Sequence, residues 1–233
     1  MRRSAIILIL MVGYCLRANA QGADFSGVYV SVYVGSPDMA ILPETVPFTA
    51  EGERAFSDFD PAVDDPRVGN DCAPRRMPAL LWSADPVEFS HAPGSTVIRF
   101  EVLEIVRNIV MDGELPGADE PHTILGHSVG HWDGDELIVE TSHMLGGVVI
   151  NDRGHPISPD ARLTERYWRE PGESDLQVEV LVDDPVNYVE PLRLRRVWTF
   201  APNEEIRPWN CFSLEMSDGE TDVDDLARML EEL

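Results

Sequence analysis

The fold is decided by the stretch HWDGDELIVE, residues 131–140, in which an Asp-Gly pair separates two alternating runs. Asp-Gly is favoured at the centre of a two-residue β-hairpin turn, so the stretch predicts a hairpin. If Asp133 and Gly134 form the turn, His127 lies directly opposite Glu140 on the neighbouring strand. The two side chains then share one face of the sheet.

A histidine beside a carboxylate has two interpretations. The carboxylate can fix the imidazole tautomer and raise its basicity, as a general base requires. In that case Arg166 or Tyr167 would stabilise an anion, and the protein would be a lyase, isomerase or hydrolase. The other interpretation is a structural cross-strand pair of His127 and Glu140. The G-x-S-x-G motif around Ser128 does not favour an esterase, because the chain continues into a second strand and no helix can start there.

Short β-like runs lie on both sides of this hairpin. They cover residues 21–34, 87–91, 96–102, 105–111, 123–132, 136–143, 163–169, 176–183 and 192–200. The run from residue 176 alternates clearly, with Leu176, Val178, Val180 and Val182 on one face. Regular spacing without intervening helices predicts a mainly β fold, either an antiparallel up-and-down barrel or a strongly curved sheet.

The first twenty residues have the pattern of a secretory signal peptide. Arg2 and Arg3 precede an apolar run, and residues 18–20 form a small-x-small cleavage site before Gln21. The apolar run is about ten residues long, too short to cross a bilayer as a helix. We therefore expect an exported protein, periplasmic or secreted, with no membrane anchor in the mature chain.

The mature chain is expected to form a single β domain over residues 21–219. An ordered loop rich in Pro and Asp interrupts it at 43–80, with a short helix at 49–56 that Thr49 caps. Residues 220–233 are acidic, with apolar residues at helical spacing, and predict an amphipathic helix or a tail.

The charge of the chain is strongly negative, with 18 basic against 42 acidic residues and a net charge of −24. This charge argues against a nucleic-acid partner, because phosphates need a basic surface. Every basic residue is Arg, so Schiff-base chemistry and the phosphate-loop lysine are excluded. We expect no cofactor, and the expected partner is a small-molecule ligand or substrate.

Three cysteines are present, and the expected cleavage removes Cys15. The remaining Cys72 and Cys211 would lie in an oxidising compartment, where an even number favours a disulfide. We predict that they pair.

The candidate ligand-binding residues come from the hairpin and the last strand. Arg195 and Trp198 belong to a cluster of cations and aromatics that is either a structural lock or, inside a cavity, a carboxylate site. His131 and His143 complete the predicted ligand-binding set. A metal site is not predicted, since strand residues four apart, such as His127 and His131, are about 13 Å apart.

Several segments carry a resemblance to a family of exported bacterial proteins of unassigned function. They are FSGVY at 25–29, PFTAEG at 47–52, CAP at 72–74, GHSVGHWDGDEL at 126–137 and LTER at 163–166. The opening strand with its Gly-x-aromatic pattern and a late Arg also resembles lipocalin-type (calycin) barrels. That resemblance implies a barrel with a ligand cavity.

The leading functional hypothesis is an exported barrel that holds a small, partly apolar molecule in a cavity lined by one face of the strands. One alternative is an enzyme on the same barrel that uses His127 and Glu140. The other is a noncatalytic envelope protein that docks through its C-terminal helix.

Overall fold

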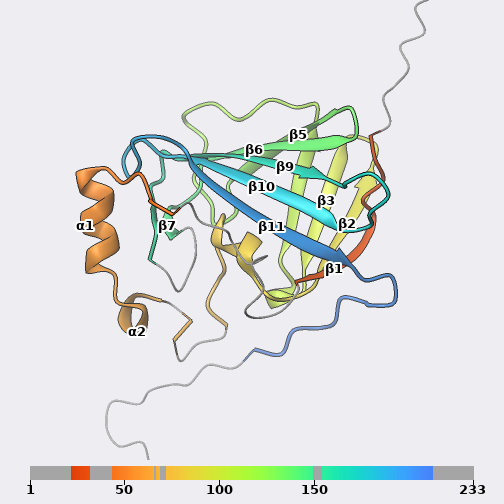
Figure 1. Ribbon diagram of the computed structural model, residues 1–233, viewed down its shortest axis with the longest axis horizontal. Coiled ribbons are helices and arrows are strands. Elements are labelled where there is room, and N and C mark those ends of the chain that lie inside the picture. Colours follow the sequence, from red (N-terminus) through yellow and green to blue (C-terminus); the bar gives the residue numbers. More distant parts are fainter. Residues whose placement is uncertain (1–21, 32–43, 66, 69–71, 149–153, 212–233) are drawn as a thin grey trace, which may run out of the picture.

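The computed structural model describes residues 22–31, 44–65, 67–68, 72–148 and 154–211. Within them the chain is mainly β, and nine strands form one closed barrel (Figure 1). The strands are β1 (Gly27–Ser31), β2 (Val87–Ala92), β3 (Ser95–Phe100), β4 (Val106–Met111), β5 (His127–Asp133), β6 (Glu136–Ser142), β9 (Arg162–Trp168), β10 (Leu176–Asp183) and β11 (Leu192–Phe200). Each overlaps a run expected from the sequence. The expected signal peptide at 1–20 and C-terminal helix at 220–233 lie outside the described residues.

The order around the barrel is β1-β11-β10-β9-β6-β5-β4-β3-β2, and β2 closes the ring on β1. Neighbouring strands are antiparallel except β4 and β5, which are parallel. The expectation of a wholly antiparallel barrel was therefore wrong at this pair. A closed ring with an odd number of strands cannot alternate in direction throughout, so one neighbouring pair must be parallel. Residues 112–126 connect the two strands and are long enough for a parallel crossover.

The hairpin of β5 and β6 forms as predicted, but its register is shifted by two residues. Asp133 lies opposite Glu136, so the central turn residues are Gly134 and Asp135. Gly134 has a φ of +61°. Glycine adopts this conformation without strain, and it is the preferred residue at the first central position of a type II′ turn.

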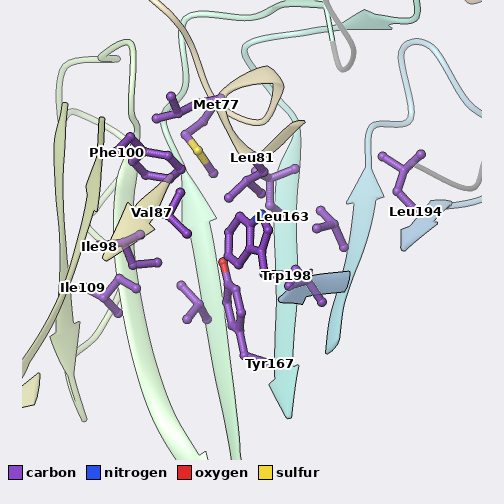
Figure 2. Close-up of a cluster of buried hydrophobic side chains, with 14 of the residues drawn as sticks. Met77, Leu81, Val87, Ile98, Phe100, Ile109, Leu163, Tyr167, Leu194 and Trp198 are labelled. Carbon is purple, nitrogen blue, oxygen red and sulfur yellow. The ribbon is translucent and has the colours of Figure 1, made fainter. Parts of the chain in front are cut away.

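Alternation along the strands places one set of side chains inside the barrel. On β10, Leu176, Val178, Val180 and Val182 are all buried, as predicted. Figure 2 shows that neighbouring strands point their apolar side chains into the same interior. The large aromatics that fill it come from five further strands and are Tyr29, Phe89, Phe100, Tyr167 and Trp198. Side chains from the strands thus pack against one another where the sequence predicted a ligand cavity.

A short 3₁₀ segment, η1 (Ala79–Trp82), packs against the interior at the end of the barrel where β1 finishes. Leu80 and Leu81 are fully buried there. Arg196, on the inner face of β11, donates to the carbonyl oxygens of Leu81 and Ser83. The last carbonyls of a helical segment lack internal donors and favour a cation. Burial lowers the pKa of Arg196 to about 10, so the guanidinium stays charged at neutral pH while it holds η1.

The remaining elements are short and lie around the barrel. They are α1 (Ala50–Asp58), α2 (Pro61–Asp64), η2 (Val102–Glu104), and the two-residue strands β7 (Gly147–Val148) and β8 (Pro156–Ile157), which pair with each other. In Figure 1, α1, α2 and β7 lie at the same end of the barrel. Thr49 caps α1 as predicted, since its Oγ1 accepts a hydrogen bond from the Gly52 N–H at 3.0 Å. The Thr49 hydroxyl also donates to the Val186 carbonyl oxygen at 2.7 Å, which fastens α1 to the loop after β10.

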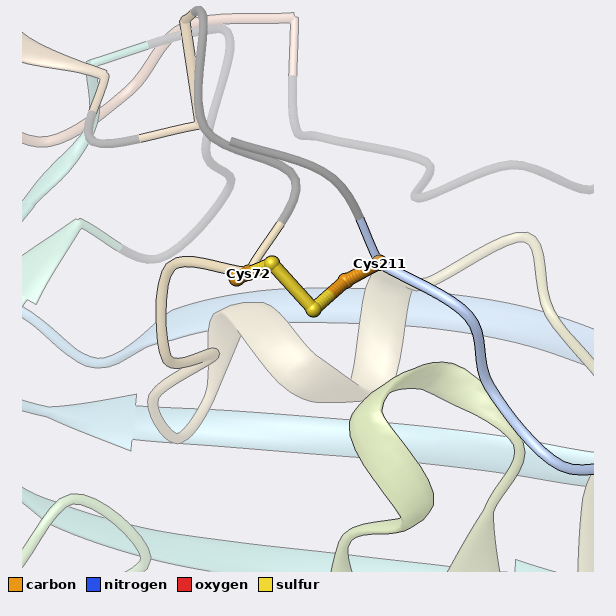
Figure 3. The surroundings of a disulfide bond; sticks show 2 residues. All are labelled: Cys72 and Cys211. Atoms are coloured by element: carbon orange, nitrogen blue, oxygen red, sulfur yellow. A yellow bond between two sulfur atoms is a disulfide. The ribbon is translucent and has the colours of Figure 1, made fainter. Parts of the chain in front are cut away.

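Cys72 and Cys211 form the predicted disulfide, with their Cα atoms 5.1 Å apart (Figure 3). The bond joins residues that are 139 positions apart in the sequence. It fastens the loop before η1 to the segment that follows β11. Among the described helices, none is both long and apolar enough to span a membrane.

Candidate functional site

The two principal residues of the predicted catalytic set are not opposite each other. The observed register places Ser142 opposite His127, and Val129 opposite Glu140. The expected His127–Glu140 pairing was therefore wrong, because the turn is formed one residue later than assumed. The inward-facing residues of this hairpin are its even-numbered residues on β5 and its odd-numbered residues on β6, so both side chains point outward. The His127 Nε2 atom lies 3.1 Å from the Pro121 carbonyl oxygen.

The other two predicted catalytic residues lie on opposite sides of β9. Arg166 is on the outer face, where it forms an ion pair with Glu136 at 2.5 Å and lies over the Trp168 ring at 4.4 Å. Tyr167 is on the inner face and is fully buried. The barrel wall therefore lies between the two side chains.

The predicted ligand-binding residues are also divided between the two faces. Trp198 is buried inside, stacked on Tyr167 with ring centroids 6.2 Å apart. Arg195 lies outside and pairs with Glu179 at 2.6 Å. His131 is exposed on the outer face of β5. His143 follows β6, where its Nδ1 atom lies 2.8 Å from Ser142 Oγ.

The barrel interior contains a buried polar network that the sequence did not predict. Arg107 on β4 donates to both carboxylate oxygens of Glu165 on β9, at 2.7 and 2.6 Å. It also donates to Ser128 Oγ at 3.0 Å and Thr141 Oγ1 at 2.8 Å. The Tyr167 hydroxyl donates to the same carboxylate. All five residues are 7% exposed or less, so the network is enclosed by the core.

The members of this network satisfy one another's hydrogen-bonding groups. Burial of an ion pair costs desolvation energy, and the pair is tolerated only when further hydrogen bonds satisfy it, as the Ser128, Thr141 and Tyr167 hydroxyls do here. The adjacent Glu165 carboxylate favours the charged form of Arg107 and raises its pKa against the effect of burial. Burial raises the pKa of Tyr167, so its hydroxyl stays protonated and keeps its role as donor.

A cavity of about 620 Å³ lies at the mouth of the barrel where β2 ends and β3 begins. This is the end opposite η1, on the right in Figure 1. Each of four adjacent strands contributes its inward-facing residue nearest the mouth. These residues are His91 on β2, Thr96 on β3, Met111 on β4 and Trp132 on β5. The β2–β3 turn, residues 92–95, and residues 22–24 and 26 before β1 complete the lining.

Hydrogen bonds fix His91 in one neutral form. Its Nε2 atom accepts a hydrogen bond from the Phe25 backbone N–H at 3.3 Å, so the proton of the neutral ring lies on Nδ1. Nδ1 then donates to Thr96 Oγ1 at 2.9 Å, and the Thr96 hydroxyl donates to Met111 Sδ at 3.5 Å. Desolvation lowers the pKa of His91, while the charge of Asp24 opposes this effect. At neutral pH the ring therefore brings no positive charge to the cavity.

The segment before β1 forms a wall of the cavity and carries its acidic group. The Asp24 Oδ1 atom accepts a hydrogen bond from the Ser26 N–H at 2.9 Å. Hydrogen bonds from Ser26 lower the pKa of Asp24, so this carboxylate is ionised at neutral pH. Gly22 lies against the indole of Trp132, where a Cβ atom would come within 1.9 Å of the ring. A side chain larger than hydrogen at position 22 would displace this wall.

The four strand residues of this mouth were not among the site residues predicted from the sequence. A signal was present, because strand alternation and the Pro93-Gly94 turn place His91 and Thr96 on the same face beside the end of a hairpin. Within the described part of the chain, no group of three or more His, Cys, Asp or Glu residues is arranged to hold a metal ion.

The fold is a closed, mostly antiparallel β-barrel of nine strands, with a cavity at one mouth. No family model matches the sequence, and no curated protein matches it. Among solved structures, a mutant of the fluorescent protein UnaG is similar at 11% sequence identity, over 76% of this chain and 96% of that chain, with a TM-score of 0.35. At this level the similarity says nothing about ligand or function.

Proposed function

We propose that this chain is an exported protein that binds a small, partly apolar molecule in the mouth of its barrel. The observation that carries the proposal is the cavity of about 620 Å³. Sites for small molecules have volumes of about 300–1,000 Å³, with an apolar lining and a few oriented polar groups. Met111 and Trp132 supply apolar surface, and Asp24 and Thr96 supply polar atoms.

The position of the cavity supports binding at the mouth. Deeper in the barrel the space is filled by the aromatic core and by the Arg107–Glu165 network. A ligand at the mouth displaces neither of them and can enter from solvent without unfolding a strand. The enzymatic alternative rested on the His127–Glu140 pairing, which the register does not form.

A thermal-shift screen with lipids, terpenoids, aromatic acids and aromatic amines tests the binding. A ligand present at 100 times its Kd stabilises the folded state by about 2.7 kcal/mol. Compounds of the class that the cavity binds should therefore raise the melting temperature measurably. If no class of small molecule stabilises the protein, the binding function is refuted.

A blocking variant then locates the site. Ser26 is exposed and lines the cavity, so Ser26→Trp should fill the mouth and abolish the shift produced by a bound ligand. Ser57→Trp, on the exposed face of α1, is the matched control, and the ligand should still raise its melting temperature. An unchanged shift in Ser26→Trp would place the ligand elsewhere.

Export is tested separately. The protein should be recovered from the periplasm or medium of a bacterial host, with Gln21 as its first residue by N-terminal sequencing. Recovery in the cytoplasm with Met1 retained would refute export without affecting the binding proposal.

A further inference from the structure

We infer that the mouth of the barrel selects ligands carrying an amine, with an aromatic or apolar body, over ligands carrying a carboxylate. This inference rests on the binding function proposed above and names its ligand class. Its basis is the charge of the residues that line the cavity and the contacts that Arg169 makes beside Asp24.

Among the described residues that line the cavity one side chain is ionised, and its charge is negative. Asp24 is the acidic residue, and no Arg occurs among the described residues that line the cavity. Its carboxylate has about four acceptor positions, of which hydrogen bonds from Ser26 use a part. The rest are available to a donor with a positive charge, and a second carboxylate in the same space would be repelled.

Arg169, which contacts the backbone of Asp24, is not among the residues that line the cavity. The Arg169 Nη1 atom donates to the Asp24 backbone carbonyl oxygen at 2.9 Å, and its Nη2 atom donates to the Tyr29 hydroxyl. Its guanidinium also lies 5.4 Å from the Phe25 ring centroid and 5.7 Å from that of Phe200. These contacts use donors of the guanidinium within the protein, and its positive charge also acts on the Asp24 carboxylate.

The rest of the lining suits the body of such a ligand. Trp132 packs against Phe25 and His91, with ring centroids 5.3 and 5.5 Å apart. Met111 presents a polarizable thioether that adapts to an aromatic surface. His91 is neutral and uses both ring nitrogens within the protein, so it adds no charge that would attract an acid.

The electrostatic field of the whole negatively charged chain also favours an amine over a carboxylate. The net charge of −24 lowers the local concentration of anions and raises that of cations around the barrel. This long-range effect is screened by salt within about 8–10 Å at physiological ionic strength, whereas the contact with Asp24 is screened less. The contribution of Asp24 can therefore be separated from that of the net charge.

The test uses three probes of nearly equal shape and different charge: 2-phenylethylamine, 3-phenylpropanoate and neutral 3-phenylpropanamide. Isothermal titration with the full mature protein at pH 7.5 should give a Kd for the amine about 10-fold below that for the acid, with the amide between them. Asp24→Asn should reduce the amine-to-acid ratio to about 2-fold, which is the part left to the net charge. Asp24→Glu, which keeps the charge, should preserve the preference.

The matched control is Asp160→Asn, which removes one exposed carboxylate at the opposite end of the barrel and should leave the ratio unchanged. Thermal melts of each variant exclude loss of the fold as the cause. Equal binding of all three probes, preference for the acid, or an unchanged ratio in Asp24→Asn would each overturn the inference. If the protein binds the acid or another screened class in place of the amine, the preference for amines is refuted and the proposed binding function is not. If neither the three probes nor any screened class binds, both the preference for amines and the proposed binding function are refuted.

Discussion

Replacing Glu165 by Gln should destabilise the protein by about 3–5 kcal/mol, because it leaves a buried cation without its counter-charge. Glu165 is 0% exposed and Arg107 is 1% exposed, so water cannot replace the lost partner. The neutral amide would also turn an NH₂ group toward the Arg107 guanidinium or the Tyr167 hydroxyl, both of which are donors to this carboxylate. The cost is therefore that of an uncompensated charge and not that of a single hydrogen bond.

Urea unfolding of the oxidised protein at pH 7, followed by far-ultraviolet circular dichroism, measures this cost directly. The melting temperature should fall by about 6–20 °C for a domain of this size. Glu136→Gln is the matched control, because Glu136 pairs with Arg166 at the surface with side chains 31% and 40% exposed. The same chemical change there should cost less than about 1 kcal/mol.

A double variant separates charge from packing. Arg107→Met combined with Glu165→Leu removes both charges and keeps most of the volume, so it should be far more stable than Glu165→Gln alone. The double variant should still lose about 1–3 kcal/mol of unfolding free energy, because the buried Tyr167 hydroxyl loses its acceptor. A cost below about 1 kcal/mol for Glu165→Gln, or a double variant less stable than that single variant, would refute this account of the interior.

Three further predictions concern the stability of the barrel and its attachments. Thr49→Ala should cost about 1 kcal/mol in urea unfolding, whereas Thr49→Ser should retain the cap of α1; equal stability of the two variants would contradict the capping role. Replacing Cys72 and Cys211 together by Ala should lower the unfolding free energy by about 5 kcal/mol, since the bond closes a loop of 139 residues, and the same loss should follow full reduction of the parent protein. The pKa of His91 is lowered in the fold, so its contribution to stability is complete above the unfolded value of about 6.5 and declines as the pH falls below it. Urea titrations from pH 8 to 5 should show this decline in the parent and a weaker one in His91→Gln; identical pH profiles would contradict the assignment.

Much of the fold could be predicted because alternation is a local property. On β10 a residue's neighbours two positions away already determine which face enters the core, so Leu176 to Val182 were placed correctly. The Thr49 cap was equally local, since the hydroxyl bonds an N–H three residues later. The Cys72–Cys211 disulfide followed from the number of cysteines left after the expected cleavage.

The candidate site could not be predicted, because it depends on contacts between distant strands. The hairpin register changed with the choice of one turn residue, which moved the partner of His127 from Glu140 to Ser142. The closeness of Arg107 and Glu165 depends on the order of strands around the barrel, which no local pattern contains. The cavity mouth likewise combines strand ends with the segment before β1.

The pairing of the first strand with the last has a consequence for how the chain is made. Tyr29 on β1 pairs with Phe200 on β11. Arg196, whose guanidinium holds η1, also lies on β11. The ring therefore cannot close while residues 192–200 are still being synthesised, and until then β1 and β10 present unpaired edges. Closure through such distant contacts is slow, in the range of milliseconds to seconds. A chain destined for transport across a membrane in extended form would gain from this delay, because transport can begin before a compact barrel exists.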